Sequence, residues 1–149
     1  MNEMKFSEDQ LEMLLNFGFR LCGNLDDARD LVQEAIFRFL RKRNSVSNPT
    51  AYIRKTMVNL FIDEKRKKII PLNIRELPEV TIPDHTKIIH VKNCLDKLTR
   101  IQRVVVVLFY MEGYKTCEIA EEIGISQGTV KTHLFRAREK LRNCLEGYL

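Results

Sequence analysis

A cluster of prolines divides the chain into two parts. The stretch over residues 69–86 shows no sustained helical period, and it contains three of the four prolines, Pro71, Pro78 and Pro83. Proline fixes φ and removes a backbone hydrogen-bond donor, so this pattern predicts an extended linker. The 149 residues then form two modules, over residues 1–68 and 87–149. Modules of this size bury a limited core and are only marginally stable.

Apolar residues in the first module recur with the period of helices. The first predicted helix begins near residue 8, and its apolar face carries Leu11, Leu14, Leu15, Gly18 and Leu21. A second helix is predicted over about residues 26–42, where acidic side chains come first and basic ones last, as the helix dipole favours. Its predicted buried side carries Leu31, Ala35, Phe39 and Leu40. Pro49 suits the start of a third helix, over about residues 50–68.

The second module has a helical pattern as well. A helix is predicted over about residues 88–97. The apolar run Val104–Tyr110 favours a strand by propensity, but no neighbouring segment resembles a partner strand. We therefore interpret it as a buried helix that Gly113 ends. The sequence thus predicts an all-α protein, with two small helical domains joined by an extended linker.

The last part of the chain has the pattern of a helix, a tight turn and a second helix. Residues 116–123 predict a short helix, and Gly124 can adopt the left-handed conformation that the turn requires. Ser126 is a good N-cap for a long helix over about residues 127–147. The inward side of that helix carries Val130, Leu134, Ala137 and Leu141. This is the spacing of a helix-turn-helix, whose second helix enters the major groove of DNA.

The outward side of the last helix carries groups that suit DNA: Gln127, Lys131, Thr132, Phe135, Arg136 and Arg138. Lysine and arginine can bond guanine or phosphate, and Phe135 and the Thr132 methyl group can touch a thymine methyl. The alternative is an ordinary helical hairpin with a solvated basic face. The glycine turn, the serine cap and the outward basic cluster together favour DNA binding.

A second basic stretch closes the first module. Residues 52–68 have a basic C-terminal half with aromatic residues upstream. Basic groups can follow phosphates, and aromatic rings can stack on unpaired bases. In the structural alternative, Lys65–Lys68 is a solvated helix end and Tyr52 and Phe61 are core residues. A mostly acidic patch, Asp30, Gln33 and Glu34, would by itself indicate only a solvent-exposed face.

Charge and composition restrict the class of protein. The formal net charge of +5 and the pI of about 9.1 favour an anionic partner. Membrane insertion is not expected, because no apolar run reaches the roughly 18 residues that span a bilayer and the first ten residues do not form a secretion signal.

The four cysteines form no CxxC pair. Their spacing favours reduced cysteines in a cytosolic protein over disulfides or a zinc site.

Three motifs, taken together, resemble a known family. They are Asp30-Leu-Val-Gln-Glu34 followed by Phe37, the segment Pro49–Arg66 with Asn59 and Asp63, and the segment Ser126–Arg138. In order and spacing, and with the proline-containing linker between them, they are similar to the extracytoplasmic-function (ECF) sigma factors of RNA polymerase. The resemblance covers nearly the whole chain. His133 and Thr132 depart from the family, which has arginine and commonly serine there.

The resemblance implies a cytoplasmic promoter-recognition factor that is not an enzyme and needs no cofactor. Its partners would be core RNA polymerase, promoter DNA and an anti-sigma factor. The first module is similar to sigma region two, in which the patch of Asp30, Gln33 and Glu34 would dock on the polymerase. The −10 element would be recognised and melted with the help of Asn59, Asp63, Lys65 and Arg66.

The second module is similar to sigma region four. Its helix-turn-helix would read the −35 element in the major groove. The residues to which the resemblance gives this role are Gln127, Lys131, Thr132, Phe135 and Arg136.

Two alternatives remain at this point. The segment Thr129–His133 also resembles the recognition helix of LuxR-type regulators, which bind operator DNA unaided, usually as dimers.

The second alternative is a metal protein or enzyme, because His90 and Cys94 could place two ligands on one helix face near His85. A further ligand is not evident, and the sequence shows no phosphate-binding loop, nucleophile motif or paired carboxylates in an apolar setting.

Overall fold

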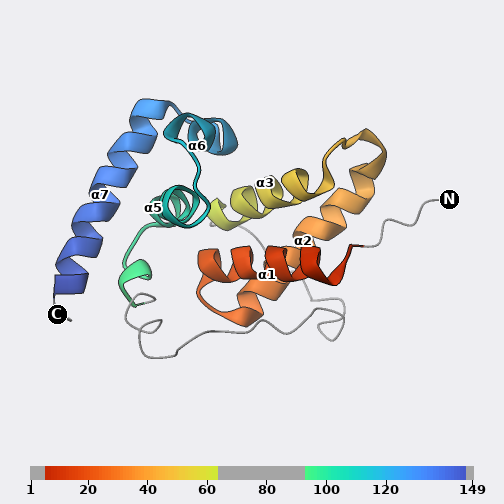
Figure 1. Ribbon diagram of the computed structural model, residues 1–149, viewed down its shortest axis with the longest axis horizontal. Helices are drawn as coiled ribbons and strands as arrows, with labels where there is room; N and C mark the ends of the chain where they lie inside the picture. Colours follow the sequence, from red (N-terminus) through yellow and green to blue (C-terminus); the bar gives the residue numbers. More distant parts are fainter. Residues whose placement is uncertain (1–5, 64–92, 147–149) are drawn as a thin grey trace. The chain divides into compact units, whose positions relative to one another are not determined.

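The computed structural model describes residues 6–63 and 93–146 (Figure 1). The chain divides into two compact units, and the described residues of each unit form helices, turns and loops but no strand. The prediction of an all-α protein with two small helical domains is confirmed. The linker predicted over residues 69–86 lies outside the described residues.

Over residues 6–63, the first unit has three α-helices that pack on one another, α1 (Glu8–Cys22), α2 (Leu25–Lys42) and α3 (Pro49–Ile62) (Figure 1). A short 3-10 helix, η1 (Arg43–Ser45), follows α2. Each α-helix begins at a side chain that accepts a backbone N–H bond: Ser7, Asn24 and Asn48. Such caps satisfy donors that a helix leaves unpaired at its start. Local sequence chemistry therefore sets where these helices begin.

The core of the first unit is apolar and shared by all three helices. Its largest fully buried side chains include Leu14, Leu15, Phe17, Leu21, Leu31, Phe39, Ile53 and Met57. Gly18 lets α1 approach its neighbours, because a Cβ there would lie 3.2 Å from Met57 Cε and 3.4 Å from Ala28 Cβ. The prediction that Leu40 is buried is wrong, because its side chain is 43% exposed on the outer side of the last turns of α2.

The third helix is shorter than predicted. It ends at Ile62, and Asp63 has an extended backbone with φ −74° and ψ 100°. The Asp63 N–H still bonds the carbonyl of Asn59, at 3.1 Å, so Asp63 is the C-cap. Aspartate is a poor helix former, and this preference favours an end at Asp63 over the predicted end at residue 68.

The second unit contains α5 (Arg100–Val106), α6 (Thr116–Ile123) and α7 (Gln127–Glu146). The run Val104–Tyr110 is helical, as predicted, and it continues from α5 into a π-helical turn, η3, over Val107–Met111. Its residues 104–108 are buried, but Tyr110 is 54% exposed, so the prediction of burial is wrong at this end of the run. Of the helix predicted over residues 88–97, the described part is helical only over residues 93–95 and then turns. Contacts of α7 with both α5 and α6 hold the unit together.

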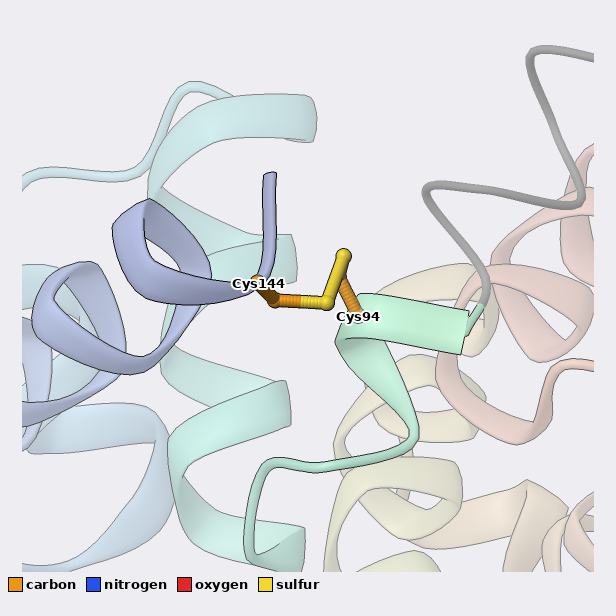
Figure 2. The surroundings of a disulfide bond; sticks show 2 residues. All are labelled: Cys94 and Cys144. Atoms are coloured by element: carbon orange, nitrogen blue, oxygen red, sulfur yellow. A yellow bond between two sulfur atoms is a disulfide. The ribbon is translucent and has the colours of Figure 1, made fainter. Parts of the chain in front are cut away.

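A disulfide joins the two ends of the described part of the second unit. Figure 2 shows Cys94, in the short helical segment before α5, bonded to Cys144 near the end of α7. Their Cα atoms lie 5.6 Å apart although 50 residues separate them in sequence. The expectation of four reduced cysteines is therefore wrong, because the fold brings together two residues whose spacing forms no recognisable motif.

None of the helices within residues 6–63 and 93–146 is both long and apolar enough to cross a bilayer.

Candidate nucleic-acid interface

A tight turn between α6 and α7 forms the predicted helix-turn-helix. Gly124 has φ 80°, and its N–H bonds the carbonyl of Ala120 at 2.9 Å. A side chain at this φ would be strained, which explains the glycine. Ser126 Oγ accepts the N–H of Thr129 at 3.1 Å and so caps α7. The turn and the cap together fix where the long helix begins.

The inner face of α7 is the predicted one. Val130, Leu134 and Ala137 are buried and pack within the unit, and Ile119 of α6 is buried as well. Leu141 is half-buried against the cluster that contains Ala137. Because these residues fix the rotation of α7 about its axis, they also fix which side chains point outward.

The outer face of α7 brings together the five residues predicted to read the −35 element. Four of them, Lys131, Thr132, Phe135 and Arg136, are exposed on the first turns of the helix. Phe135 is 64% exposed, which is unusual for a large aromatic side chain and is typical of a contact surface. Gln127 is exposed too, but its Nε2 donates to Thr116 Oγ1 at 2.8 Å and ties α7 to the start of α6.

Arg138 makes contacts that the sequence did not indicate. Its Nε donates to the Tyr110 hydroxyl at 2.5 Å, and its guanidinium lies 5.6 Å from the ring centroids of both Phe109 and Tyr110. These cation–π contacts attach α7 to η3. Arg138 is therefore held by the fold and helps to orient α7.

His133 lies at the edge of the outer face and is half-buried. Burial, and then the nearby Arg136 guanidinium, lower the pKa of His133 below the ordinary value of 6.5. Between that lowered pKa and 6.5, the unfolded chain binds more protons than the folded chain. The free energy of unfolding therefore rises with pH in this window, and the contribution is lost as the pH falls through 6.5.

We expect His133→Gln to reduce this pH dependence. Between pH 7.5 and pH 5.5, the melting temperature of the second unit should fall more in the wild-type chain than in the variant. Thermal unfolding followed by circular dichroism, in buffers of equal ionic strength, measures the difference. Equal falls in both chains would show that His133 does not carry the effect.

The first unit has a basic pocket between α2 and α3. This open cavity, of about 620 Å³, is lined by Arg38, Arg41, Lys42, Tyr52, Lys55, Thr56 and Asn59. Four of these residues are cationic and none is acidic, although Arg38 is paired with Glu34 at 3.1 Å. A concave basic surface that also carries an aromatic ring suits an unpaired nucleic-acid strand.

The residues predicted to bind the −10 element are placed only in part. Asn59 lies in the pocket and is exposed, and Asp63 is exposed one turn further along, at the end of α3. Lys65 and Arg66 lie outside the described residues. Of the four, the structure thus places only Asn59 in the pocket.

The sequence interpretation missed most of the pocket. The sequence assigns Arg41 and Lys42 to the helix dipole, leaves Tyr52 open between base stacking and the core, and does not single out Lys55. A signal was present, because the α2 residues recur at spacings of three and four (Arg38, Arg41 and Lys42) and so do those of α3 (Tyr52, Lys55, Thr56 and Asn59). Only the packing of α2 on α3 shows that the basic stripe of α2 and the mostly polar stripe of α3 face one pocket.

The acidic patch differs from its prediction. Glu34 is 5% exposed, and its carboxylate accepts a hydrogen bond from Arg38 Nη2 at 3.1 Å. A carboxylate with so little exposure needs a paired cation, and this one is not part of an open acidic face. Asp30 and Gln33 are half-buried, and Phe37, one turn further along α2, is 41% exposed.

The described part of the chain does not support the alternative of a metal site. Among residues 6–63 and 93–146, no three histidine, cysteine or acidic side chains are grouped to hold an ion. Cys94 is bonded to Cys144, and His85 and His90 lie outside the described residues.

Known proteins match both units. Residues 8–68 match the family description Sigma-70 region 2, and residues 90–141 match Sigma-70, region 4. The chain is 33% identical to RNA polymerase sigma factor SigV of Bacillus subtilis, over 90% of this chain and 85% of that protein. It is 30% identical to ECF RNA polymerase sigma factor SigE of Mycolicibacterium smegmatis, over 90% of this chain and 58% of that one.

A solved structure shares the fold. The sigma factor RpoE of Bartonella quintana, crystallised with the anti-sigma factor NepR, superposes with a TM-score of 0.67 at 22% identity, and the match covers 92% of each chain. The fold and the matches together define a two-unit helical protein of transcription initiation. The chain belongs to the ECF sigma factors, which bind core RNA polymerase and direct initiation at promoters; a LuxR-like regulator is not favoured.

Proposed function

We propose that the two units, which extend over about residues 1–68 and 87–149, recognise two different forms of promoter DNA. The observation that carries the proposal is their contrast in shape. The outer face of α7 is a convex row of exposed side chains, whereas the basic surface between α2 and α3 is hollow. A convex helix fits the major groove of a duplex. A hollow basic surface accommodates bases that have left the stack.

The −35 duplex is the proposed ligand of α7. Lys131 and Arg136 supply cationic donors for guanine or phosphate, and Phe135 supplies an apolar contact for a thymine methyl. Thr132 Oγ1 donates to the Gly128 carbonyl at 3.1 Å. With its hydroxyl proton so engaged, we assign Thr132 an apolar methyl contact. Gln127 positions α7 through its bond to Thr116 and contacts DNA only at the edge of the site.

The opened −10 strand is the proposed ligand of the pocket. Lys55, Arg41 and Lys42 would follow phosphates, and Asn59 would bond the edge of an extruded base. Asp63, Lys65 and Arg66 continue the same chain segment beyond α3 and are assigned to the same strand. Binding of unstacked bases offsets the few kcal/mol that unstacking costs, so opening needs no covalent step by this chain.

Core RNA polymerase is the proposed partner of the stripe formed by Asp30, Gln33 and Phe37. Their spacings of three and four place them along one side of α2. Glu34, which the resemblance places in the docking patch, is assigned a different role, because its ion pair with Arg38 positions a cation of the −10 pocket. As in the complex of the Bartonella quintana protein, an anti-sigma factor is a proposed further partner. The chain would act in the cytoplasm, where the polymerase is.

Run-off transcription tests the proposal directly. Core RNA polymerase would be combined with or without the purified chain on a library of genomic promoter fragments. We expect discrete new start sites that share an upstream pair of motifs. The proposal fails if no new starts appear and the chain alone binds duplex DNA as a dimer.

Asn59→Ala is expected to slow promoter opening about tenfold while leaving polymerase binding intact. One lost base contact is worth roughly 1–3 kcal/mol, and Asn59 is exposed, so its side chain contributes little to the fold. Stopped-flow fluorescence of a 2-aminopurine in the −10 element measures the opening rate, and gel filtration measures complex formation. Equal loss of opening and of polymerase binding would contradict the role assigned to Asn59.

A further inference from the structure

The disulfide of the second unit connects the two ends of its described segment. Cys94 lies in the short segment of residues 93–98 that precedes α5, and Cys144 lies in the last turn of α7 (Figure 2). Cys94 is fully buried and Cys144 is 7% exposed. The bond therefore closes a loop that contains α5, α6 and nearly all of α7, which is the whole helix-turn-helix.

Contacts other than the disulfide also hold the segment before α5 against the rest of the second unit. Leu95 and Leu98 pack in one apolar cluster with Val106 and Ala137. The guanidinium of Arg103, which is nearly buried, pairs with Asp96 at 2.7 Å. These contacts do not depend on the bond, so we expect them to keep the Cys94 and Cys144 sulfurs close together in the reduced chain as well.

We propose that Cys94 and Cys144 are a redox couple that changes the thermal stability of the second unit and, through it, binding to the −35 duplex. The inference rests on the cytoplasmic location proposed above. Cytoplasmic thiols are kept reduced, and disulfides that form there are usually transient and serve catalysis or redox sensing. A buried pair at bonding distance in such a protein is bonded under oxidising conditions and reduced otherwise.

The reductant is a cellular dithiol, and the exchange balances. One thiolate of the dithiol attacks Cys144 Sγ, because the last turn of a helix opens more easily than its middle. The Cys94 thiolate leaves and takes a proton. The second thiol then attacks the mixed disulfide and releases Cys144, which takes the other proton. Two electrons pass to the protein, and the dithiol becomes a disulfide. A low-molecular-weight disulfide drives the reverse reaction.

The size of the effect follows from the length of the closed loop. A disulfide stabilises mainly by restricting the unfolded chain, and a separation of 50 residues is long. In a domain of this size, the typical stabilisation by a disulfide corresponds to a shift of roughly 10–25 °C in melting temperature. The second unit is small, so a shift of this size can decide whether it is folded at growth temperature.

The bond acts on DNA binding through folding, because it is far from the DNA-reading side chains. Cys144 follows Arg136, the DNA-reading residue nearest to it in α7, by eight residues, which corresponds to about 12 Å along the helix axis. The comparison uses the holoenzyme, which is the chain bound to core RNA polymerase. At low temperature, the holoenzymes made with oxidised and with reduced chain should bind a −35 duplex with affinities within about twofold of each other. Between the two melting temperatures, only the oxidised chain should bind.

The first test uses the full chain without DNA or polymerase. Alkylation of exposed thiols followed by mass spectrometry should recover Cys94 and Cys144 as one linked peptide pair after equilibration in oxidised glutathione, and as two alkylated peptides after dithiothreitol. Dithiothreitol should lower the melting temperature of the second unit by roughly 10–25 °C. Hydrogen exchange of peptides from α7 assigns the transition to this unit.

Variants separate the bond from other effects of the reductant. The pair Cys94→Ala and Cys144→Ala, made together, should melt at the reduced wild-type temperature and ignore dithiothreitol. Cys117→Ala is the matched control, because Cys117 is exposed and outside the bond, and it should keep the wild-type response. The proposal is overturned if the wild-type melting temperature is unchanged by dithiothreitol, or if the double variant responds equally. Because these readouts need no promoter, failure of the sigma-factor assignments would not affect them.

Discussion

Replacing Phe39 with alanine should lower the free energy of unfolding of the first unit by about 3–5 kcal/mol. The Phe39 side chain is fully buried, and its ring meets those of Phe6 and Tyr52 edge-on at centroid distances of 5.9 Å and 6.1 Å. Truncation removes these contacts and leaves a cavity that three packed helices cannot close. A small domain has little more stability than this to lose, so the variant should be largely unfolded near 37 °C.

Phe37→Ala is the matched control for this experiment. It deletes the same atoms from the same helix two residues away, but its side chain is 41% exposed and its main contact is the Arg41 guanidinium at 4.6 Å. Its cost should be under about 1 kcal/mol. Urea unfolding followed by circular dichroism compares the two variants. The Phe37→Ala chain should be folded but should bind core polymerase more weakly than the wild-type chain does, because Phe37 is part of the proposed docking stripe. Similar losses of stability in both variants would refute the assigned burial.

Local sequence chemistry was sufficient to predict the helix-turn-helix. The start and end of α6, the left-handed turn at Gly124 and the cap at Ser126 each depend on residues within one or two turns of chain. The apolar period then fixed which side of α7 is buried. These features are independent of distant contacts, so sequence and structure agree there.

Features that depend on packing between distant residues could not be predicted. The basic stripe of α2 and the polar stripe of α3 form one pocket only after the helices pack, and the two bonded cysteines meet across 50 residues. Glu34 was expected on a solvent-exposed face, but the structure buries it beside Arg38. Period alone does not decide the edge of a buried face, and a partner one turn away can satisfy a charge there.

Arg136→Ala should weaken holoenzyme binding to a −35 duplex about tenfold to a hundredfold, with little change in melting temperature. Arg136 is exposed on the outer face of α7, and one specific base contact is worth roughly 1–3 kcal/mol. Arg142→Ala is the control, because Arg142 is also exposed on the same helix and its ion pair with Glu139, at 3.4 Å, lies at the surface. Arg142 follows Arg136 by six residues, so it lies about 9 Å further along the axis of α7. Fluorescence anisotropy on the promoters recovered by run-off transcription measures both.

The Arg136→Ala chain offers a second readout that needs no DNA. Arg136 is one of the two causes that lower the pKa of His133, so its removal should raise that pKa towards 6.5, whereas Arg142→Ala should leave it unchanged. Titration of the His133 ring by NMR measures the shift. A raised pKa with unchanged duplex affinity would confirm that Arg136 lies beside His133 but show that Arg136 does not contact DNA. A loss of affinity with a collapsed melting temperature would instead mean that Arg136 supports the fold of α7.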